Sequence, residues 1–186
     1  MNGPAPDPED GQLIAAWCRG DAAAFDALYA RWRGPVWRFL VAQAGAEFAD
    51  ELHQETWLAV VRGRDRYREQ DRFAGWLFTL ARNCVIDAAR RRAARPEPEQ
   101  PIDADTTPAE GADAAQQLDG ERRAGDLRAA VAALPDAQRE TVLLRWEAGL
   151  TLPEIAAHTG VPLDTVKSRL RYAMARLREE FPDHGR

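Results

Sequence analysis

Two stretches of this chain combine cationic and hydrogen-bonding side chains in patterns that suit nucleic-acid binding. In residues 61–95, ten arginines stand against four acidic residues. Basic, aromatic and other candidate contact residues alternate there: Arg62, Arg64, Arg66, Tyr67, Phe73, Trp76, Phe78, Leu80, Arg82, Asn83, Arg90 and Arg91. Single-stranded nucleic acid needs charge neutralisation, stacking surfaces and hydrogen bonds to base edges, and this stretch offers all three.

Most of these aromatic residues belong, by their helical spacing, to a hydrophobic core. The prediction of strand binding therefore rests on four residues that we place off the buried face: Tyr67, Phe78, Arg82 and Asn83. Asn83 can donate and accept hydrogen bonds at once, so it suits the edge of an extruded base, with Phe78 as an aromatic wall. The structural alternative is that Asn83 caps or interrupts the helix.

The last helical segment, residues 163–181, carries a polar face of a second kind. At 100° per residue, the side opposite its apolar stripe holds three hydrogen-bonding side chains flanked by cations. These are Thr165, Ser168 and Tyr172, with Lys167, Arg169 and Arg171. Such groups can reach base edges in a major groove while the flanking cations meet phosphates, so this face is typical of a helix that reads duplex DNA.

The elements that must position this face form a helix-turn-helix. The capping box over residues 151–154, TLPE, starts a short helix, Gly160 ends it, and the helix over 163–181 follows. Ala156 is small where the two helices cross, and Val166 returns to the core. Any antiparallel helix pair needs a small residue and a glycine turn, so these two features alone do not indicate DNA binding. The DNA-binding hypothesis depends instead on the polar face of the second helix.

Helical spacing also runs through the rest of the chain. Asp21 can cap a helix that bends or breaks at Gly34 and Pro35, and a second helix starts near Asp50. In the second half, one short helix stops at Pro135 and another opens there. Alanine is frequent and β-branched residues are scarce, so the composition predicts an all-α fold.

A Pro- and Ala-rich segment divides the chain into two small helical domains. Residues 96–126 carry two arginines against nine acids and few large aliphatic side chains, which predicts a flexible acidic linker. We therefore expect one domain over 12–95 and another over 127–181, with a disordered N-terminus over 1–11 and a tail over 182–186. The net charge of −5 hides this separation of basic from acidic segments.

Several function classes find no support in the chain. Cys18 and Cys84, without a C-x-x-C spacing, argue against a disulfide framework and a structural zinc site. The histidines are scattered, and the H-x-E at His53 lacks the P-C-x-x-C of zinc deaminases, so no catalysis, metal or cofactor is expected. No apolar run reaches the ~18 residues of a membrane span and no signal peptide opens the chain, which predicts a cytoplasmic protein without membrane insertion of its own.

Four motifs, in order, resemble the bacterial extracytoplasmic-function (ECF) sigma factors. Residues 50–58, DELHQETWL, are similar to the D-x-x-Q-E-T/A-F-L signature in region 2 of that family. Residues 73–83, FAGWLFTLARN, are similar to the F-x-x-W-L-x-x-I-A-R-N run that follows it. The second half resembles region 4 at residues 134–135, 139–140, 154–156 and 165–170.

The resemblance implies a subunit that joins core RNA polymerase, directs it to promoters and promotes melting. It assigns binding of the clamp coiled coil of the largest core subunit to Asp50, Glu51, Gln54, Glu55 and Leu58. It assigns the melted −10 element to Tyr67, Trp76, Phe78, Leu80, Arg82, Asn83, Arg90 and Arg91. It assigns the duplex −35 element to Thr165, Lys167, Ser168, Arg169, Arg171 and Tyr172, and places the polymerase flap against region 4. Many family members are held inactive by an anti-sigma factor, and nothing in this chain identifies one.

Two positions depart from the family pattern. Tyr172 stands where an arginine is usual on the base-facing side, so the −35 preference cannot be copied from relatives. Cys84 stands where a small polar residue is common, and both a redox-sensitive and an inert buried thiol fit that position.

The alternative function is a helix-turn-helix regulator that binds duplex DNA as a dimer without core polymerase. Such a regulator would bind a palindromic duplex by itself. A sigma factor binds promoters specifically only when it is joined to the core enzyme, so a gel shift with and without core polymerase separates the two.

Overall fold

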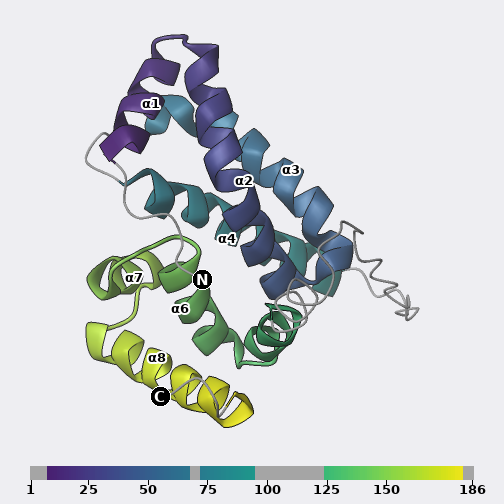
Figure 1. The fold of residues 1–186 in the computed structure, drawn as a ribbon. Helices are drawn as coiled ribbons and strands as arrows, with labels where there is room; N and C mark the ends of the chain where they lie inside the picture. Colours follow the sequence, from purple (N-terminus) through teal and green to yellow (C-terminus); the bar gives the residue numbers. More distant parts are fainter. Residues whose placement is uncertain (1–7, 68–71, 95–123, 182–186) are drawn as a thin grey trace, which may run out of the picture.

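The computed structural model describes residues 8–67, 72–94 and 124–181, and every element within these ranges is a helix. The predicted all-α fold is confirmed. Figure 1 shows the helices in two groups, one from each half of the chain. Most of the predicted linker over 96–126, most of the N-terminal segment and the tail over 182–186 lie outside the described residues.

The first group folds around a long helical hairpin. Its elements are α1 (Pro8–Cys18), α2 (Ala22–Ala44), α3 (Ala46–Gly63), the 3₁₀ turn η1 (Arg64–Arg66) and α4 (Phe73–Ala93). Asp21 caps α2 as predicted, because its carboxylate accepts the backbone N–H of Ala23 at 3.0 Å. Gly45, at a φ of 94°, makes the corner between α2 and α3, where a side chain would strain the backbone.

The first helix begins earlier than the sequence predicts. Residues 1–11 were expected to lie outside the folded part, but α1 starts at Pro8 and the side chain of Asp10 is buried. Asp10 pairs with Arg31 at 2.7 Å and accepts the indole N–H of Trp32 at 3.0 Å. A buried carboxylate needs such donors, and these stand twenty-one and twenty-two residues away, beyond the reach of local patterns.

The second helix runs without a break through the predicted interruption at Gly34 and Pro35. Proline removes one backbone donor and crowds the preceding turn, so it usually bends or ends a helix. Here Pro35 is itself buried, and Trp32 and Phe39 on either side of it belong to the same buried stripe. Packing of both halves of α2 on one core outweighs the local cost of the proline.

The second group contains the helix-turn-helix. A helix over residues 124–132 precedes α6 (Asp136–Trp146), α7 (Leu152–Thr159) and α8 (Leu163–Glu180). The predicted capping box is present, because Thr151 Oγ1 accepts the Glu154 N–H at 3.4 Å while Glu154 Oε2 accepts the Thr151 N–H at 2.7 Å. Gly160 ends α7 in the left-handed conformation, at a φ of 71°.

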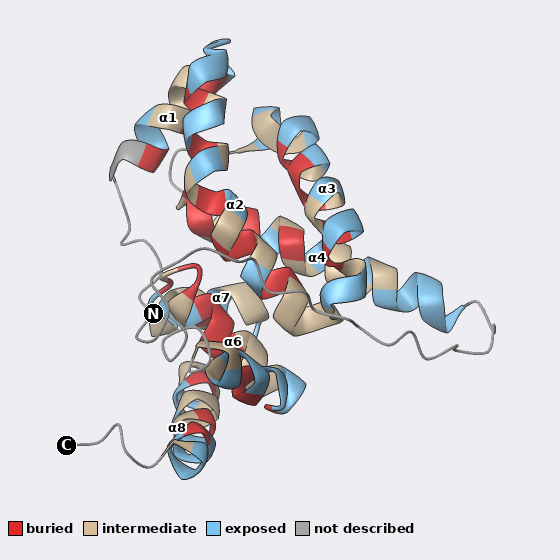
Figure 2. Ribbon diagram, turned by 45° about the vertical axis from the view of Figure 1, so that its right-hand side comes forward, coloured by how far each residue is buried: buried red, intermediate tan, exposed pale blue. Residues whose placement is uncertain are grey.

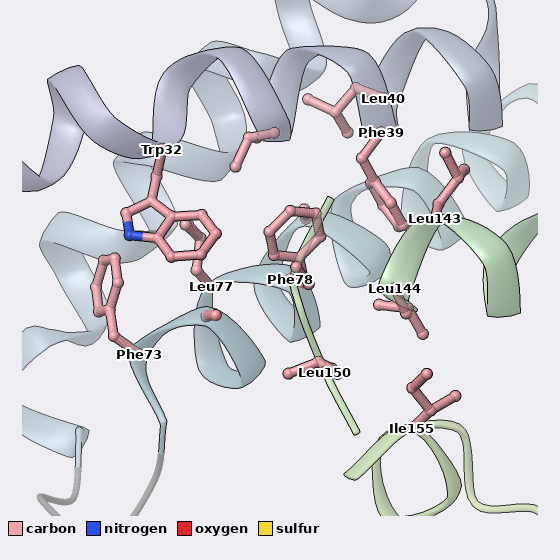
Figure 3. Packing of buried hydrophobic residues seen from close by; sticks show 14 of the residues in the cluster. Trp32, Phe39, Leu40, Phe73, Leu77, Phe78, Leu143, Leu144, Leu150 and Ile155 are labelled. Atoms are coloured by element: carbon pink, nitrogen blue, oxygen red, sulfur yellow. The ribbon is translucent and has the colours of Figure 1, made fainter. Parts of the chain in front are cut away.

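One hydrophobic core continues through both groups. α6 packs against α2, and α7 packs against α4. Figure 2 shows buried segments, in red, on these facing helices. Figure 3 shows Phe39 and Phe78 of the first group together with Leu143, Leu144 and Leu150 of the second. The two halves that the sequence separates by a linker therefore share an interface.

Candidate nucleic-acid interface

α7 and α8 form the predicted helix-turn-helix. Ile155 of α7 and Val166 of α8 are fully buried, and Gly160 supplies the turn between the helices. Ala173 and Leu177 continue the buried stripe of α8 toward its C-terminus. This packing leaves the opposite side of α8 in solvent, where the polar face was predicted.

The six residues predicted to read a duplex lie on the solvent side and flanks of α8. Three are exposed: Lys167, Arg171 and Tyr172. Three are half-buried: Thr165, Ser168 and Arg169. The Lys167 ammonium lies 3.0 Å from the Asp164 carboxylate, and the Arg171 guanidinium lies 5.0 Å from the Tyr172 ring centroid. The structure brings the six together on one helix, and their contact with DNA stays a prediction.

α4 carries most of the residues predicted to bind a single strand. Asn83 is exposed, whereas Tyr67, Trp76, Leu80 and Arg82 are half-buried. Trp76, Leu80 and Asn83 follow one another at steps of four and three residues, so they share one face of α4. The ring of Tyr67, just after η1, packs against Trp76 with 5.3 Å between centroids.

Phe78 does not lie on that exposed face. The prediction placed it off the buried side, but its side chain is 0 % exposed. Its ring packs edge-on against Phe39 at 5.2 Å and against Trp32 at 6.1 Å. The prediction was wrong because α4 contacts α2, α3 and α7, so its buried arc is wider than that of a helix packed on one layer.

The acidic and polar face predicted to bind polymerase lies on α3. Asp50, Glu51, Gln54 and Leu58 are exposed, and Glu55 is half-buried. Leu58 and Val61, one turn apart, have exposed fractions of 51 % and 45 %. These two exposed apolar side chains on one face of α3, beside carboxylates, make this face a candidate for protein docking.

The end of α4 brings two of the predicted surfaces into contact. Arg91, assigned to DNA, lies 3.0 Å from Glu55, assigned to polymerase. Arg90 lies 3.5 Å from Asp87 on its own helix. The predicted −10 and polymerase surfaces therefore adjoin where α3 and α4 pack together.

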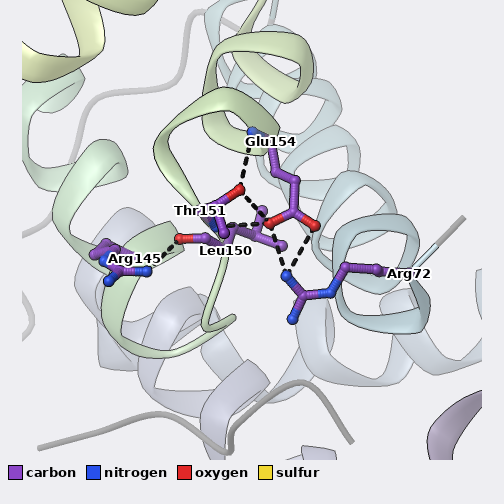
Figure 4. A network of polar contacts seen from close by, with 5 residues as sticks. All are labelled: Arg72, Arg145, Leu150, Thr151 and Glu154. Atoms are coloured by element: carbon purple, nitrogen blue, oxygen red, sulfur yellow. Dashed lines mark hydrogen bonds and ion pairs between the residues drawn. The ribbon is translucent and has the colours of Figure 1, made fainter. Parts of the chain in front are cut away.

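Among the described residues, three ion pairs between the two helix groups have no counterpart in the sequence predictions. Arg38 of α2 pairs with Glu147 at 2.7 Å, Arg72 pairs with Glu154 at 2.7 Å, and Arg82 pairs with Glu140. Figure 4 shows how Glu154 binds Arg72 while it still caps α7 through Thr151. No sequence pattern predicts these pairs, because their members stand 58 to 109 residues apart.

Glu154 is held in its charged form by these contacts. Partial burial alone would raise the pKa of this carboxyl, but the hydrogen bonds from Arg72 and Thr151 outweigh burial and lower it. The carboxylate is therefore ionised at neutral pH, and its pairing with Arg72 persists until the solution is acidified below the ordinary glutamate range.

Cys84 is half-buried between α3 and α4. Burial raises the pKa of the thiol, against a smaller lowering effect of its hydrogen bond to Thr56. A raised pKa reduces the fraction of reactive thiolate at neutral pH. Of the two alternatives that the sequence leaves open for this cysteine, the structure favours the inert thiol.

His158 of α7 lies in the interface between the two groups. Its Nδ1 is 3.1 Å from the hydroxyl of Thr79, and that hydroxyl donates to the Gly75 carbonyl. The Thr79 oxygen is thus left to accept from Nδ1–H, which assigns the neutral tautomer with a bare Nε2. That Nε2 is buried and has no hydrogen-bond partner within the described part of the chain.

We expect acidification to weaken this interface through His158. Burial lowers the pKa of His158, and the charge of Arg82 lowers it further. The nearby carboxylate of Glu140 raises the pKa, but by less than burial lowers it. The unfolded or separated state therefore takes up the proton first as the pH falls below the ordinary histidine value of about 6.5, and stability drops by at most ~1.4 kcal/mol per pH unit. The loss should level off below the folded-state pKa. Melting temperatures of wild type and His158→Gln across this range measure the effect, and identical pH profiles for the two would contradict it.

Both halves of the chain match known family models. Sigma-70 region 2 matches residues 28–95, and Sigma-70, region 4 matches residues 130–179. The chain is 36% identical over 164 residues to the ECF RNA polymerase sigma factor RpoE of Cereibacter sphaeroides, covering 87% of this chain and 88% of that protein. It is 34% identical over 170 residues to the ECF RNA polymerase sigma factor SigE of Mycolicibacterium smegmatis, covering 89% of this chain and 66% of that longer protein.

Two solved structures share the fold. One is the sigma factor RpoE in complex with the anti-sigma factor NepR from Bartonella quintana, with a TM-score of 0.64 at 23% identity over 86% of this chain and 98% of that one. The other is CnrH in complex with the cytosolic domain of CnrY, with a TM-score of 0.63 at 24% identity over 95% of this chain and 99% of that one. Together with the sequence relatives and both region matches, they lead to one conclusion: this chain belongs to the ECF sigma factors, which direct RNA polymerase to promoters.

Proposed function

We propose that this sigma factor joins core RNA polymerase through α3, holds the melted −10 strand along α4 and reads the −35 duplex with α8. The observation that supports the proposal is that one chain carries two surfaces of different chemistry, each suited to a different form of nucleic acid. α4 offers Trp76, Leu80 and Asn83 for a single strand, and α8 offers hydrogen-bonding groups and cations for a duplex. A duplex-binding regulator needs only the second surface, so the first favours a sigma factor.

The chain is proposed to act by binding, without catalysis of its own, in the cytoplasm where promoter DNA and polymerase meet. Within the described ranges, every helix is too short or too polar to cross a bilayer. The RpoE structure among the fold relatives contains an anti-sigma factor. We infer that an anti-sigma factor regulates this chain as well, without naming which one.

Asn83 is proposed to recognise an extruded base of the −10 element. It is exposed on the same face of α4 as Trp76 and Leu80, which can pack against the base while the amide bonds its edge. Trp76 takes over the stacking role that the sequence assigned to Phe78, because Phe78 is buried.

The polymerase contact is proposed to centre on Leu58. This side chain and Val61 form an apolar centre, and Glu51, Gln54 and Glu55 supply a polar rim on the same side of α3. Interfaces of this kind draw most of their affinity from a few central apolar residues, while rim charges set orientation and association rate.

We expect Leu58→Ala to weaken binding to core polymerase by about tenfold or more, the usual effect of truncating a central interface residue. Gln54→Ala and Glu55→Ala should weaken it less. All three should leave the melting temperature near that of wild type, because Leu58 and Gln54 are exposed and the half-buried Glu55 pairs with an Arg91 side chain that is exposed. Titration of labelled protein with core polymerase gives the dissociation constants.

The matched control is Asp26→Asn, which removes an exposed carboxylate that belongs to α2 and not to the proposed patch on α3. It should bind core polymerase as wild type does. Normal binding by Leu58→Ala, Gln54→Ala and Glu55→Ala alike would show that α3 is not the polymerase contact.

A further inference from the structure

The second helix group partly covers one stripe in the N-terminal half of α4, over residues 72–82. Arg72, the N-cap of α4, binds both carboxylate oxygens of Glu154 at 2.7 and 2.8 Å. Arg82 binds Glu140 through its Nε. The two arginines are ten residues apart, which places them about 15 Å apart along the helix axis.

The positions between the two arginines also contact the second group, although Thr79 itself stays exposed. Gly75 lies so close to the second group that a Cβ built on it would meet a Leu150 methyl at 3.8 Å. Thr79 lies 3.1 Å from His158. Residues 72, 75, 79 and 82 follow helical spacing of three and four residues, so they form one continuous stripe of α4.

The covered stripe adjoins the surface proposed to hold the melted strand. Trp76, Leu80 and Asn83 each stand one residue after a member of the covered stripe, about 100° around the helix. A strand whose bases lie on these three side chains would bring its phosphates to the neighbouring arginines. In the structure, where the two helix groups pack together, the carboxylates of Glu154 and Glu140 already bind these arginines. We call this packed state the closed arrangement.

We propose that Arg72 and Arg82 bind phosphates of the melted promoter strand, and that Glu154 and Glu140 occupy the same arginines when the second helix group closes on the first. Strand binding and closure then exclude each other, so the free sigma factor masks its own −10 surface. The inference rests on the proposed function of α4 and adds Arg72 to its contacts.

The chemistry of the two arginines fits this exchange of partners. A guanidinium binds a carboxylate or a phosphate through the same set of N–H donors. The Arg72 and Arg82 side chains are 29 % and 32 % exposed, and those of their partners Glu154 and Glu140 are 33 % and 15 % exposed, so both ion pairs are partly open to solvent and to screening by salt. A polyanionic strand can therefore displace the carboxylates, whereas a fully buried pair would resist it.

The third cross-group pair supplies an independent way to open the molecule. Arg38 donates to Glu147 through Nε, at 3.0 Å to each oxygen, and through Nη2 at 2.7 Å. Arg38 lies on α2 and belongs to no proposed DNA contact. Glu147→Gln should therefore loosen closure without altering the proposed phosphate site.

The test measures binding of a labelled, mixed-sequence single strand of about twelve nucleotides to the full chain by fluorescence anisotropy. Glu140→Gln/Glu154→Gln removes both carboxylate charges and keeps the capping box, where glutamine also serves. If closure leaves about a tenth of the molecules competent, this variant should bind the strand about tenfold more tightly than wild type. Glu147→Gln should also bind more tightly.

Two further variants isolate the cause. Asp26→Asn/Glu179→Gln makes the same change in net charge at exposed sites outside the interface, and it should gain little. Adding Arg72→Gln and Arg82→Gln to Glu140→Gln/Glu154→Gln should weaken strand binding and reduce its log–log salt dependence by about 1.4, since each phosphate contact of a single strand contributes about 0.7. Melting curves check that each variant is folded.

Three results would overturn the inference. They are an unchanged affinity in Glu140→Gln/Glu154→Gln, an equal gain in the charge-matched control, or an unchanged salt dependence after loss of the two arginines. If core polymerase with the wild-type chain still transcribes from specific promoters, such results contradict this inference and leave the proposed function intact. Absence of promoter-specific transcription would instead overturn the proposed function.

Discussion

Phe78→Ala should cost about 3–5 kcal/mol of the free energy of unfolding, the range for truncating a buried phenylalanine. The ring of Phe78 is fully buried between Trp32 and Phe39 of α2, so its loss leaves a cavity in the centre of the first helix group. The residues proposed to contact polymerase and DNA stand on helices that pack around this core. Polymerase binding and promoter melting should therefore fall together with stability, as chemical denaturation and permanganate footprinting would measure.

Two other variants separate this packing role from a role in stacking on DNA. Phe78→Leu keeps most of the buried volume, so it should remain folded and still melt promoters. Asn83→Ala changes an exposed side chain, so it should keep full stability and polymerase binding. It should impair promoter melting, and the defect should be smaller on templates whose −10 element is already melted. A stable Phe78→Leu protein that binds polymerase but no longer melts DNA would contradict the packing role.

Changes on the solvent side of α8 should split into two kinds. Lys167→Ala removes a cation proposed to meet a phosphate, so it should lower affinity for all promoters alike and reduce the log–log salt slope by about one. Tyr172→Ala removes a ring that is 55 % exposed and proposed to face bases. It should change the preference at one −35 position by about 1–3 kcal/mol, and Ser168→Ala should do so at another.

A promoter library assayed with the reconstituted holoenzyme at two salt concentrations measures both effects. Asp164→Asn serves as the control for Lys167, because it removes the nearby carboxylate while the cation stays. If Lys167→Ala altered sequence preference while Tyr172→Ala lowered all affinities uniformly, the proposed orientation of α8 on the duplex would be wrong.

The local chemistry of the chain was enough to predict the helix-turn-helix. Thr151 and Glu154 form their capping box within four residues, Gly160 turns the chain at a positive φ, and Val166 packs inward. Each of these features depends on neighbours in sequence. For the same reason, the start of α2 at Asp21 and the polar face of α8 follow from spacing alone.

Features that depend on distant packing could not be predicted in this way. α2 continues through Pro35 because residues on both sides of the proline pack on a core that no local pattern reveals. Phe78 is buried because several helices cover α4, and Asp10 is buried because α2 supplies its donors. The pairing of Arg72 with Glu154 arises only once the two helix groups meet.

The most direct test of the central claim is a gel shift with promoter DNA, with and without core RNA polymerase. Promoter fragments are first obtained by selecting genomic fragments that the reconstituted holoenzyme retains. A sigma factor should retard these fragments specifically only together with core polymerase, and core polymerase alone should not select them. Equal, specific binding by the chain without core polymerase would contradict the account and identify a regulator that acts through its helix-turn-helix alone.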